Sequence, residues 1–247
     1  MDTAFVIGNG ESRNIFPIDN LKGHGTIYGC NAIYRDHPML CDHIVAVNPD
    51  MYAELEKWHN NGKESPIIYG RQQISDWNYI CEGDHPQDVP TGLKIFRIWR
   101  GGDIKKGGKI KTNDFSKARG SGCSAVLLAA ESGIKNIVIM AFDIMGAQQW
   151  EMETPSRLQN NIYKNTSNYP DRASMKAYLK YEWMYQLRQI LRRFPSTSFY
   201  FINRREYLEG NPFLRWYFDQ PNVKCGIYAD LQRWISGHRD DIKWKAL

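Results

Sequence analysis

The chain has few cysteines, and their arrangement indicates no structural role. Its five cysteines are odd in number and contain no Cys-x-x-Cys pair, which argues against a disulfide framework or a zinc site. No apolar run approaches the roughly 20 residues of a membrane-spanning helix, and no basic segment typical of a secretory signal opens the chain. We therefore expect a cytoplasmic protein without a membrane span.

Several motifs of common enzyme classes are also absent. The chain contains no Gly-x-x-x-x-Gly-Lys-Ser/Thr, His-Glu-x-x-His or Gly-x-Ser-x-Gly motif. Its opening glycine turn lacks the third glycine of the dinucleotide fingerprint, since Arg13 stands there, and Cys30-Asn31 occupies the place of the expected ribose-binding acid. These absences disfavour P-loop hydrolysis, zinc proteolysis, serine-hydrolase chemistry and dehydrogenase chemistry.

The overall composition is that of an ordinary globular domain. Hydrophobic residues make up 42% and charged residues 24% of the 247 residues, a length that allows a substantial core. The net charge of +5 suggests an anionic ligand or partner without requiring one.

Short apolar segments alternate with segments of helical periodicity. The predicted strands are Thr3–Gly8, Thr26–Cys30, His43–Val47, Pro66–Tyr69, Leu93–Trp99, Asn136–Asp143 and Ser198–Ile202. The predicted helices are Asp50–His59, Ser121–Ser132 and Asp171–Phe194. Because several strands are apolar throughout, we predict an α/β fold: one Rossmann-like domain whose mostly parallel sheet carries helices on both faces.

The domain organisation follows from these segments. Residues 1–203 form the predicted Rossmann-like, nucleotide-sugar-binding domain, and residues 204–247 form an irregular C-terminal extension packed on it. Segments 101–120 and 144–170 are predicted to be long lid-like loops, the first rich in lysine and arginine, that belong to a lid or acceptor region.

Two glycine-rich turns are suited to bind an anion. The first turn holds Gly8, Gly10 and Ser12 after the first strand, and the second holds Arg119, Gly120, Ser121 and Gly122 at the start of a helix. Helix N-termini present unpaired N–H groups and the positive end of a dipole, and small residues allow a ligand to approach the backbone. Two such turns in one chain indicate a nucleotide.

Polar residues follow four of the predicted strands. Asn9, Asn31 and Asn48 come after the first three, and Asp143 ends the sixth. Ligands of parallel sheets bind at the carboxyl ends of the strands, and a neutral amide both donates and accepts hydrogen bonds, as base edges and sugar hydroxyls require. Each asparagine alone also suits a turn.

Five ordered blocks carry a family resemblance. They are Ile7–Ser12, Gly29–Tyr34, Val47–Pro49, Gly120–Ala125 and Ile139–Asp143. In order and spacing this set resembles the small bacterial sialyltransferases that use CMP-sialic acid. It is also similar to the wider group of Rossmann-like proteins with a Gly-Asn-Gly-Pro-Ser opening, which includes hydroxymethylpterin pyrophosphokinase-like proteins.

The resemblance implies roles for particular residues. Asn9, Asn31 and Asn48 would contact the nucleotide or the transferred sugar, and Ser121 and Gly122 would lie beside the nucleotide phosphate. Such transferases need no metal, and the chain has no Asp-x-Asp motif after a strand, so we predict neither a metal nor a cofactor, only a nucleotide-sugar co-substrate.

The chain also departs from the family pattern. Glu11 replaces the proline of the opening motif, and Met145 and Trp150 stand near the places of tyrosines that bind phosphate in the family. The family's general base is a histidine before the long helix, but residues 162–172 contain none. In that segment only Asp171, Tyr163 and Tyr169 could replace the histidine, and Asp171 is also a good helix N-cap. The predicted candidates for the catalytic base are Asp143, His85 and Asp171.

The function predicted from the sequence is glycosyl transfer. The donor is CMP-sialic acid-like or another nucleotide sugar, and the acceptor hydroxyl belongs to a glycan or, alternatively, to a modified base in DNA, which the basic loop and abundant aromatic residues suit. Two further alternatives are a pyrophosphokinase-like enzyme and a protein that binds a nucleotide or nucleotide sugar without catalysis.

Overall fold

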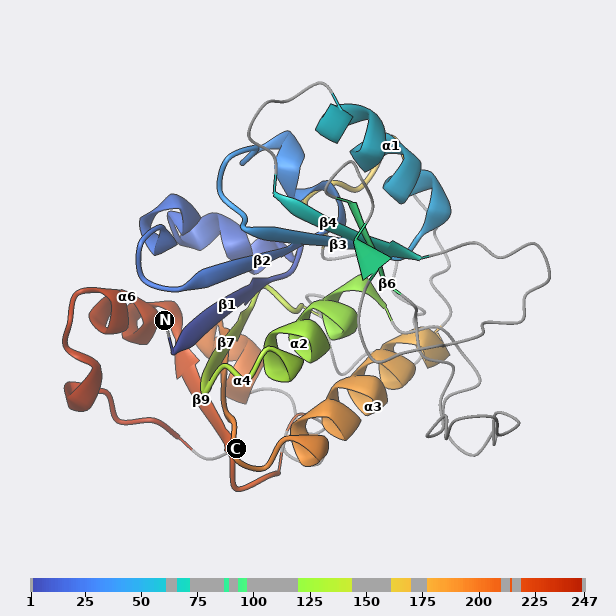
Figure 1. Ribbon diagram of the computed structural model, residues 1–247. Coiled ribbons are helices and arrows are strands. Elements are labelled where there is room, and N and C mark those ends of the chain that lie inside the picture. Colours follow the sequence, from blue (N-terminus) through green and yellow to red (C-terminus); the bar gives the residue numbers. More distant parts are fainter. Residues whose placement is uncertain are drawn as a thin grey trace.

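One largely parallel sheet organises the part of the chain that the structure describes. The computed structural model describes residues 2–60, 66–71, 87–88, 93–96, 120–143, 161–169, 177–209, 214 and 219–245. Within these ranges the sheet has the order β5-β6-β4-β3-β2-β1-β7-β8-β9 (Figure 1). Its strands are β1 (Thr3–Ile7), β2 (Thr26–Cys30), β3 (His43–Ala46), β4 (Ile67–Arg71), β5 (Gln87–Asp88), β6 (Leu93–Phe96), β7 (Asn136–Met140), β8 (Ser198–Asn203) and β9 (Val223–Ile227).

The pairing of these strands confirms the predicted α/β fold. The short β5 pairs antiparallel with β6, and every other pairing between these strands is parallel. All five residues of β1 are buried, which explains why its sequence does not alternate between apolar and polar: both of its faces are covered.

Helices cover both faces of the sheet. The α-helices are α1 (Pro49–Asn60), α2 (Ser121–Glu131), α3 (Ala177–Arg193), α4 (Arg205–Glu209) and α6 (Tyr228–Ile235). Short 3-10 helices are η1 (Glu11–Ile15), η2 (Ile18–Leu21), η3 (Asn31–Arg35) and η4 (Arg239–Asp241). Residues of α2 and α3 belong to the core on one face, and residues of η2, η3, α1 and α6 belong to the core on the other. Among the described residues, no helix has the length and apolar character needed to cross a membrane.

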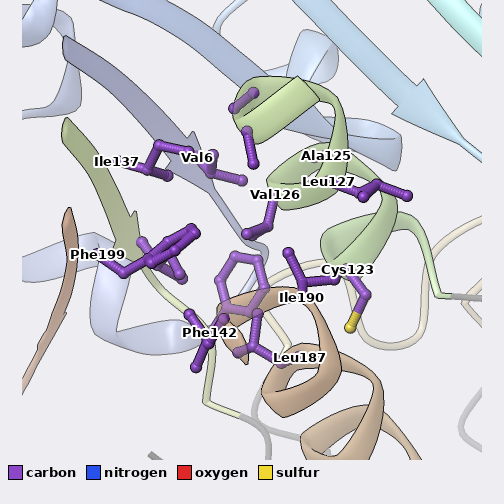
Figure 2. Close-up of a cluster of buried hydrophobic side chains, with 14 of the residues drawn as sticks. Val6, Cys123, Ala125, Val126, Leu127, Ile137, Phe142, Leu187, Ile190 and Phe199 are labelled. Atoms are coloured by element: carbon purple, nitrogen blue, oxygen red, sulfur yellow. The ribbon is translucent and has the colours of Figure 1, made fainter. Parts of the chain in front are cut away.

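The core on the α2 face is built from small residues of α2 and larger ones around it. In Figure 2 the Phe142 ring lies beside Val126 of α2 and next to Leu187 and Ile190 of α3. Helix α2 is apolar on nearly every side because it is enclosed between α3 and the sheet. Burial of each such large side chain stabilises the fold by about 1.5–3 kcal/mol, so this face holds α2 firmly in place.

The order of the strands places a switch point beside β1. From β1 the chain proceeds through β2, β3, β4 and β6 in one direction, and then returns to add β7, β8 and β9 on the other side of β1. Ile7 of β1 is paired with Met140 of β7, so the residues that follow both strands emerge at the same edge of the sheet. Ligands of open parallel sheets bind at this kind of position.

The prediction for the C-terminal region was wrong. Residues after 203 include β9 and α6, and β9 pairs with β8 from Phe199–Val223 to Asn203–Ile227, so the sheet does not end at residue 203. The β9 sequence contains a lysine and a glycine, which weaken the strand signal, and its stability comes from the neighbouring strand. The predicted first residues of the long helix, 171–176, lie outside the described residues.

Candidate functional site

The turn after β1 is packed directly against the end of β7. A β-carbon at Gly8 would lie 2.3 Å from the backbone oxygen of Ala141, and one at Gly10 would lie 2.4 Å from Cγ of Asp143. The Gly10 N–H donates to the Ala141 oxygen at 2.9 Å. Packing alone therefore explains why both positions are glycine, because no larger residue fits between the strand ends.

Four side chains meet at the carboxyl ends of β1 and β2, and we call them the amide cluster: Asn9, Asn31, Ser121 and Tyr169. The Ser121 hydroxyl donates to Oδ1 of Asn31 at 2.7 Å and accepts from the Val47 N–H at 3.1 Å. The Asn9 amide donates to the Cys30 oxygen at 3.1 Å and to the Tyr169 hydroxyl at 3.3 Å. Three of the residues predicted from the sequence thus belong to one hydrogen-bonded group.

The amide cluster is electrically neutral. Burial raises the pKa of Tyr169 to about 12, although hydrogen bonds from Asn9 and Asn31 oppose this rise, so its hydroxyl keeps its proton at ordinary pH. Asn31 adopts a left-handed backbone conformation (φ 50°), which asparagine tolerates better than most residues, and this directs the chain into η3. Neutral donors and acceptors of this kind suit a base edge or sugar hydroxyls.

The N-terminus of α2 lies beside this cluster. Its N-cap is Gly120, which has no side chain to cap the helix, and the Gly120 N–H donates to Oε1 of the buried Gln186 at 3.0 Å. A β-carbon at Gly122 would lie 2.9 Å from the Phe142 ring, so glycine is again required by packing. Because Ser121 is the first residue of α2, its hydroxyl lies at the positive end of the helix dipole.

A second group lies on the other side of the β1 turn, and we call it the carboxylate cluster: Ser12, Asp143, Asn203 and Tyr228. Asp143 Oδ2 accepts from the Ser12 N–H at 2.8 Å, and Oδ1 accepts from the Ser12 hydroxyl at 2.6 Å and from the Asn203 amide at 2.9 Å. The Tyr228 hydroxyl lies 3.0 Å from the Ser12 hydroxyl. The cluster joins the ends of β1, β7 and β8 to the start of α6.

Arg13 connects the β1 turn to segment 161–169. Its buried guanidinium donates to Oδ1 of Asn9 at 3.4 Å and to the Tyr163 hydroxyl at 3.0 Å, and it forms an ion pair with Asp36 at 2.9 Å. The Ile162 N–H donates to the Asn9 oxygen at 3.0 Å. Segment 161–169, expected to belong to a long loop, therefore forms one wall of the amide cluster.

Arg35 fastens the same segment from the side of η3. Its guanidinium donates to the Thr166 hydroxyl at 2.8 Å and to the Ser167 oxygen at 2.9 Å, and it forms an ion pair with Glu54 of α1 at 2.6 Å. The same guanidinium lies over the rings of Tyr163 and Tyr169. Sequence reasoning did not identify Arg13 or Arg35.

The remaining predicted residues lie elsewhere or outside the described ranges. Asn48 is exposed, and its Oδ1 accepts from the Asp50 N–H at 2.9 Å at the start of α1, which is the N-cap arrangement. His85, Asp171 and Arg119 lie outside the described residues, as do 101–119 and 144–160 of the predicted loops. In the ranges that are described, no three histidine, cysteine, aspartate or glutamate residues gather where they could hold a metal ion.

Comparisons of this chain with protein-family models, curated proteins and solved structures find no match. The fold and its clusters therefore define the class of protein by themselves. It is a Rossmann-like α/β protein in which neutral polar side chains and a helix N-terminus gather at the switch point of the sheet.

Proposed function

We propose that this protein is a glycosyltransferase, which moves a sugar from a nucleotide-activated donor to a hydroxyl acceptor without a metal. One observation supports this most: Asn9, Asn31 and Ser121, from three separate elements, meet at the carboxyl ends of the strands. Their meeting point lies beside the first turn of α2, where an anion is favoured. A nucleotide sugar combines the groups that suit such a place, namely a phosphate with a base and a sugar.

The proposed reaction breaks the bond between the anomeric carbon of the sugar and the phosphate oxygen. A bond from the acceptor oxygen to the anomeric carbon replaces it, the acceptor proton passes to a general base, and the nucleotide leaves with the additional negative charge. The N–H groups and dipole at the start of α2 would stabilise this charge, and stabilisation of developing charge lowers the barrier of the transfer. The donor is CMP-sialic acid-like or another nucleotide sugar.

A panel of nucleotides and nucleotide sugars tests the proposal. Binding of CMP, UDP and GDP and of their sugar conjugates to the full chain would be measured by calorimetry, and release of the free nucleotide by chromatography. We expect one base to bind and its sugar conjugate to be cleaved slowly in the absence of acceptor. Failure of every compound to bind at millimolar concentration would contradict the proposal.

The variant Asn31→Gly tests whether the nucleotide binds at the amide cluster. Asn31 has a positive φ, so glycine keeps the backbone unstrained while the amide is lost. We expect binding to weaken about tenfold in Asn31→Gly, the effect of one or two lost hydrogen bonds, with the folded structure retained. Unchanged affinity would place the ligand away from the amide cluster.

A second candidate is a nucleotide-sugar-binding protein without catalysis. The observation that favours it is the surroundings of Asp143, whose two oxygens accept three hydrogen bonds from protein groups. Of the three predicted bases, Asp143 alone lies within the described residues. The two functions differ in donor cleavage: tight binding of an intact nucleotide sugar, with no release of nucleotide over days with or without acceptors, would favour the binding protein.

A further inference from the structure

The carboxylate cluster forms an ordered chain of hydrogen bonds. The single proton of the Ser12 hydroxyl is directed to Asp143, so the Tyr228 hydroxyl must donate to Ser12 across their 3.0 Å contact. The Tyr228 oxygen in turn accepts from the backbone N–H of Ala141. Ala141 has φ 57°, an unusual backbone conformation for alanine, and its oxygen accepts from Gly10. All of these bonds converge on the turn after β1.

The carboxylate of Asp143 is largely occupied by this turn. An ionised carboxylate offers about four acceptor positions, and three of them hold the Ser12 N–H, the Ser12 hydroxyl and the Asn203 amide. Ser12 is 1% exposed and Asn203 is fully buried, so these donors are shielded from water. A substrate hydroxyl would have to displace one of these donors or use the single remaining position.

The same turn carries Asn9. The N–H groups of its two neighbours, Gly8 and Gly10, donate to the oxygens of Met140 and Ala141 at 2.9 Å each. The Asn9 side chain then points to the Cys30 oxygen and to Tyr169 in the amide cluster. The backbone that places this amide is therefore held on one side by β7 and on the other by the bonds from Asp143 to Ser12.

We propose that Asp143 is a positioning residue: together with Ser12 and Tyr228 it holds the turn that places Asn9 in the donor site, and another group accepts the proton of the acceptor. This inference rests on the proposed function for its substrate. It also assigns a role to the C-terminal helix α6, whose first residue closes a chain of hydrogen bonds that starts at the end of β1.

Two variants test the positioning role, and a third serves as the control. Asp143→Asn replaces an acceptor of the Ser12 N–H by a group with fewer acceptor positions, and Tyr228→Phe removes only the hydroxyl that donates to Ser12. Tyr207→Phe is the control, because the buried Tyr207 hydroxyl donates to the Phe142 oxygen at 3.3 Å near the same strand end, a bond that does not involve Ser12. Tyr228→Phe keeps the test valid if Asp143→Asn does not fold.

The readouts are the dissociation constant for the nucleotide identified in the panel, the rate of donor cleavage at saturation, and hydrogen exchange of the amides in residues 8–13. We expect Asp143→Asn and Tyr228→Phe to weaken binding by about threefold to tenfold and to speed exchange in the turn, with Tyr207→Phe close to wild type. The saturated rate should fall by less than the affinity does.

Two results would overturn the inference. Unchanged affinity together with a hundredfold or larger loss of the saturated rate in Asp143→Asn would identify Asp143 as the base. Unchanged affinity and unchanged hydrogen exchange in both variants would show that the carboxylate cluster does not hold the turn. If the wild type binds no nucleotide, the proposed function fails while the exchange data still decide whether Asp143 and Tyr228 hold the turn.

Discussion

The two clusters lie on either side of one turn, yet they differ in what they leave for a ligand. The carboxylate cluster contains the charge, but its donors and acceptors are matched to one another inside the protein. The four residues of the amide cluster are neutral and also bond to one another and to Arg13, but they lie at the first turn of α2, whose N-cap is a glycine without a side chain to cap the helix. The comparison teaches that a charged residue at a strand end is not by itself evidence of chemistry.

The largest expected effect comes from Gly10→Ala, which disturbs both clusters at once. The new β-carbon would lie 2.4 Å from Cγ of Asp143 and 2.7 Å from the Ala141 oxygen. Because neither neighbour is the far end of a flexible chain, we expect a loss of about 3 kcal/mol or more in the free energy of unfolding, measured with urea.

Gly237→Ala is the control for this substitution. Gly237 has φ 85° and no atom within 4 Å of the added carbon, so only backbone strain of about 1 kcal/mol is expected. Equal losses in the two variants would mean that the strand ends move apart easily and that the turn is not held as described.

Ser12→Ala and Ser121→Ala compare the clusters directly. Loss of the Ser12 hydroxyl removes one donor from the Asp143 carboxylate and the acceptor of the buried Tyr228 hydroxyl, so we expect a loss of about 2 kcal/mol in the free energy of unfolding. Loss of the Ser121 hydroxyl removes the acceptor of the Val47 N–H and the donor to Oδ1 of Asn31, but neither partner is a carboxylate, so the loss should be smaller, about 1 kcal/mol.

For nucleotide affinity we expect the opposite ranking of these two variants. Ser121 belongs to the proposed donor site itself, whereas Ser12 acts through the turn, so Ser121→Ala should weaken binding more than Ser12→Ala does. Calorimetric titrations and urea unfolding of both variants check the two rankings. If Ser12→Ala lost more affinity and less stability than Ser121→Ala, the roles given to the clusters would have to be exchanged.

A further effect, absent at neutral pH, is an alkaline loss of stability from Tyr169. Its pKa is about 12 in the folded protein, raised chiefly by burial, against about 10 in an unfolded chain. The stability that this difference contributes is fully present below pH 10 and is lost as the pH rises toward 12, because the unfolded chain then releases its proton first.

Comparison of wild type with Tyr169→Phe isolates this contribution. The free energy of unfolding of the wild type should fall more steeply between pH 10 and pH 12 than that of the variant. Parallel curves would show that Tyr169 titrates normally and lies in water rather than within the amide cluster. Other buried tyrosines titrate in both proteins and so cancel in the difference.

Much of the fold and three of the four residues of the amide cluster could be predicted from the sequence. Short segments that are apolar throughout predicted the parallel sheet. The rule that ligands bind at the carboxyl ends of strands pointed to Asn9 and Asn31, and the glycine-rich helix N-terminus pointed to Ser121. Asn203 follows the same rule, and the prediction missed it by ending the strand one residue early, at Ile202.

The rest of the site depends on contacts that no local pattern shows. Tyr228 reaches Ser12 across 216 positions of sequence, and Arg13 reaches Tyr163 across 150. The sequence distinguishes Arg13 only as the residue that replaces a glycine of the dinucleotide fingerprint. Its position in the structure explains the replacement, since a guanidinium there pairs with Asp36 and holds Asn9.

The most direct test of the central claim maps where the nucleotide binds. Hydrogen exchange of the full chain would be compared with and without the nucleotide that binds best. We predict slower exchange at residues 8–13, 31–35 and 120–124, all of which lie at the carboxyl ends of the strands. At the opposite ends of β2, β3 and β4 lies an open hollow lined by residues that include Lys22, Met39 and Asp42. Protection there, with none at Asn31 and Ser121, would contradict the account.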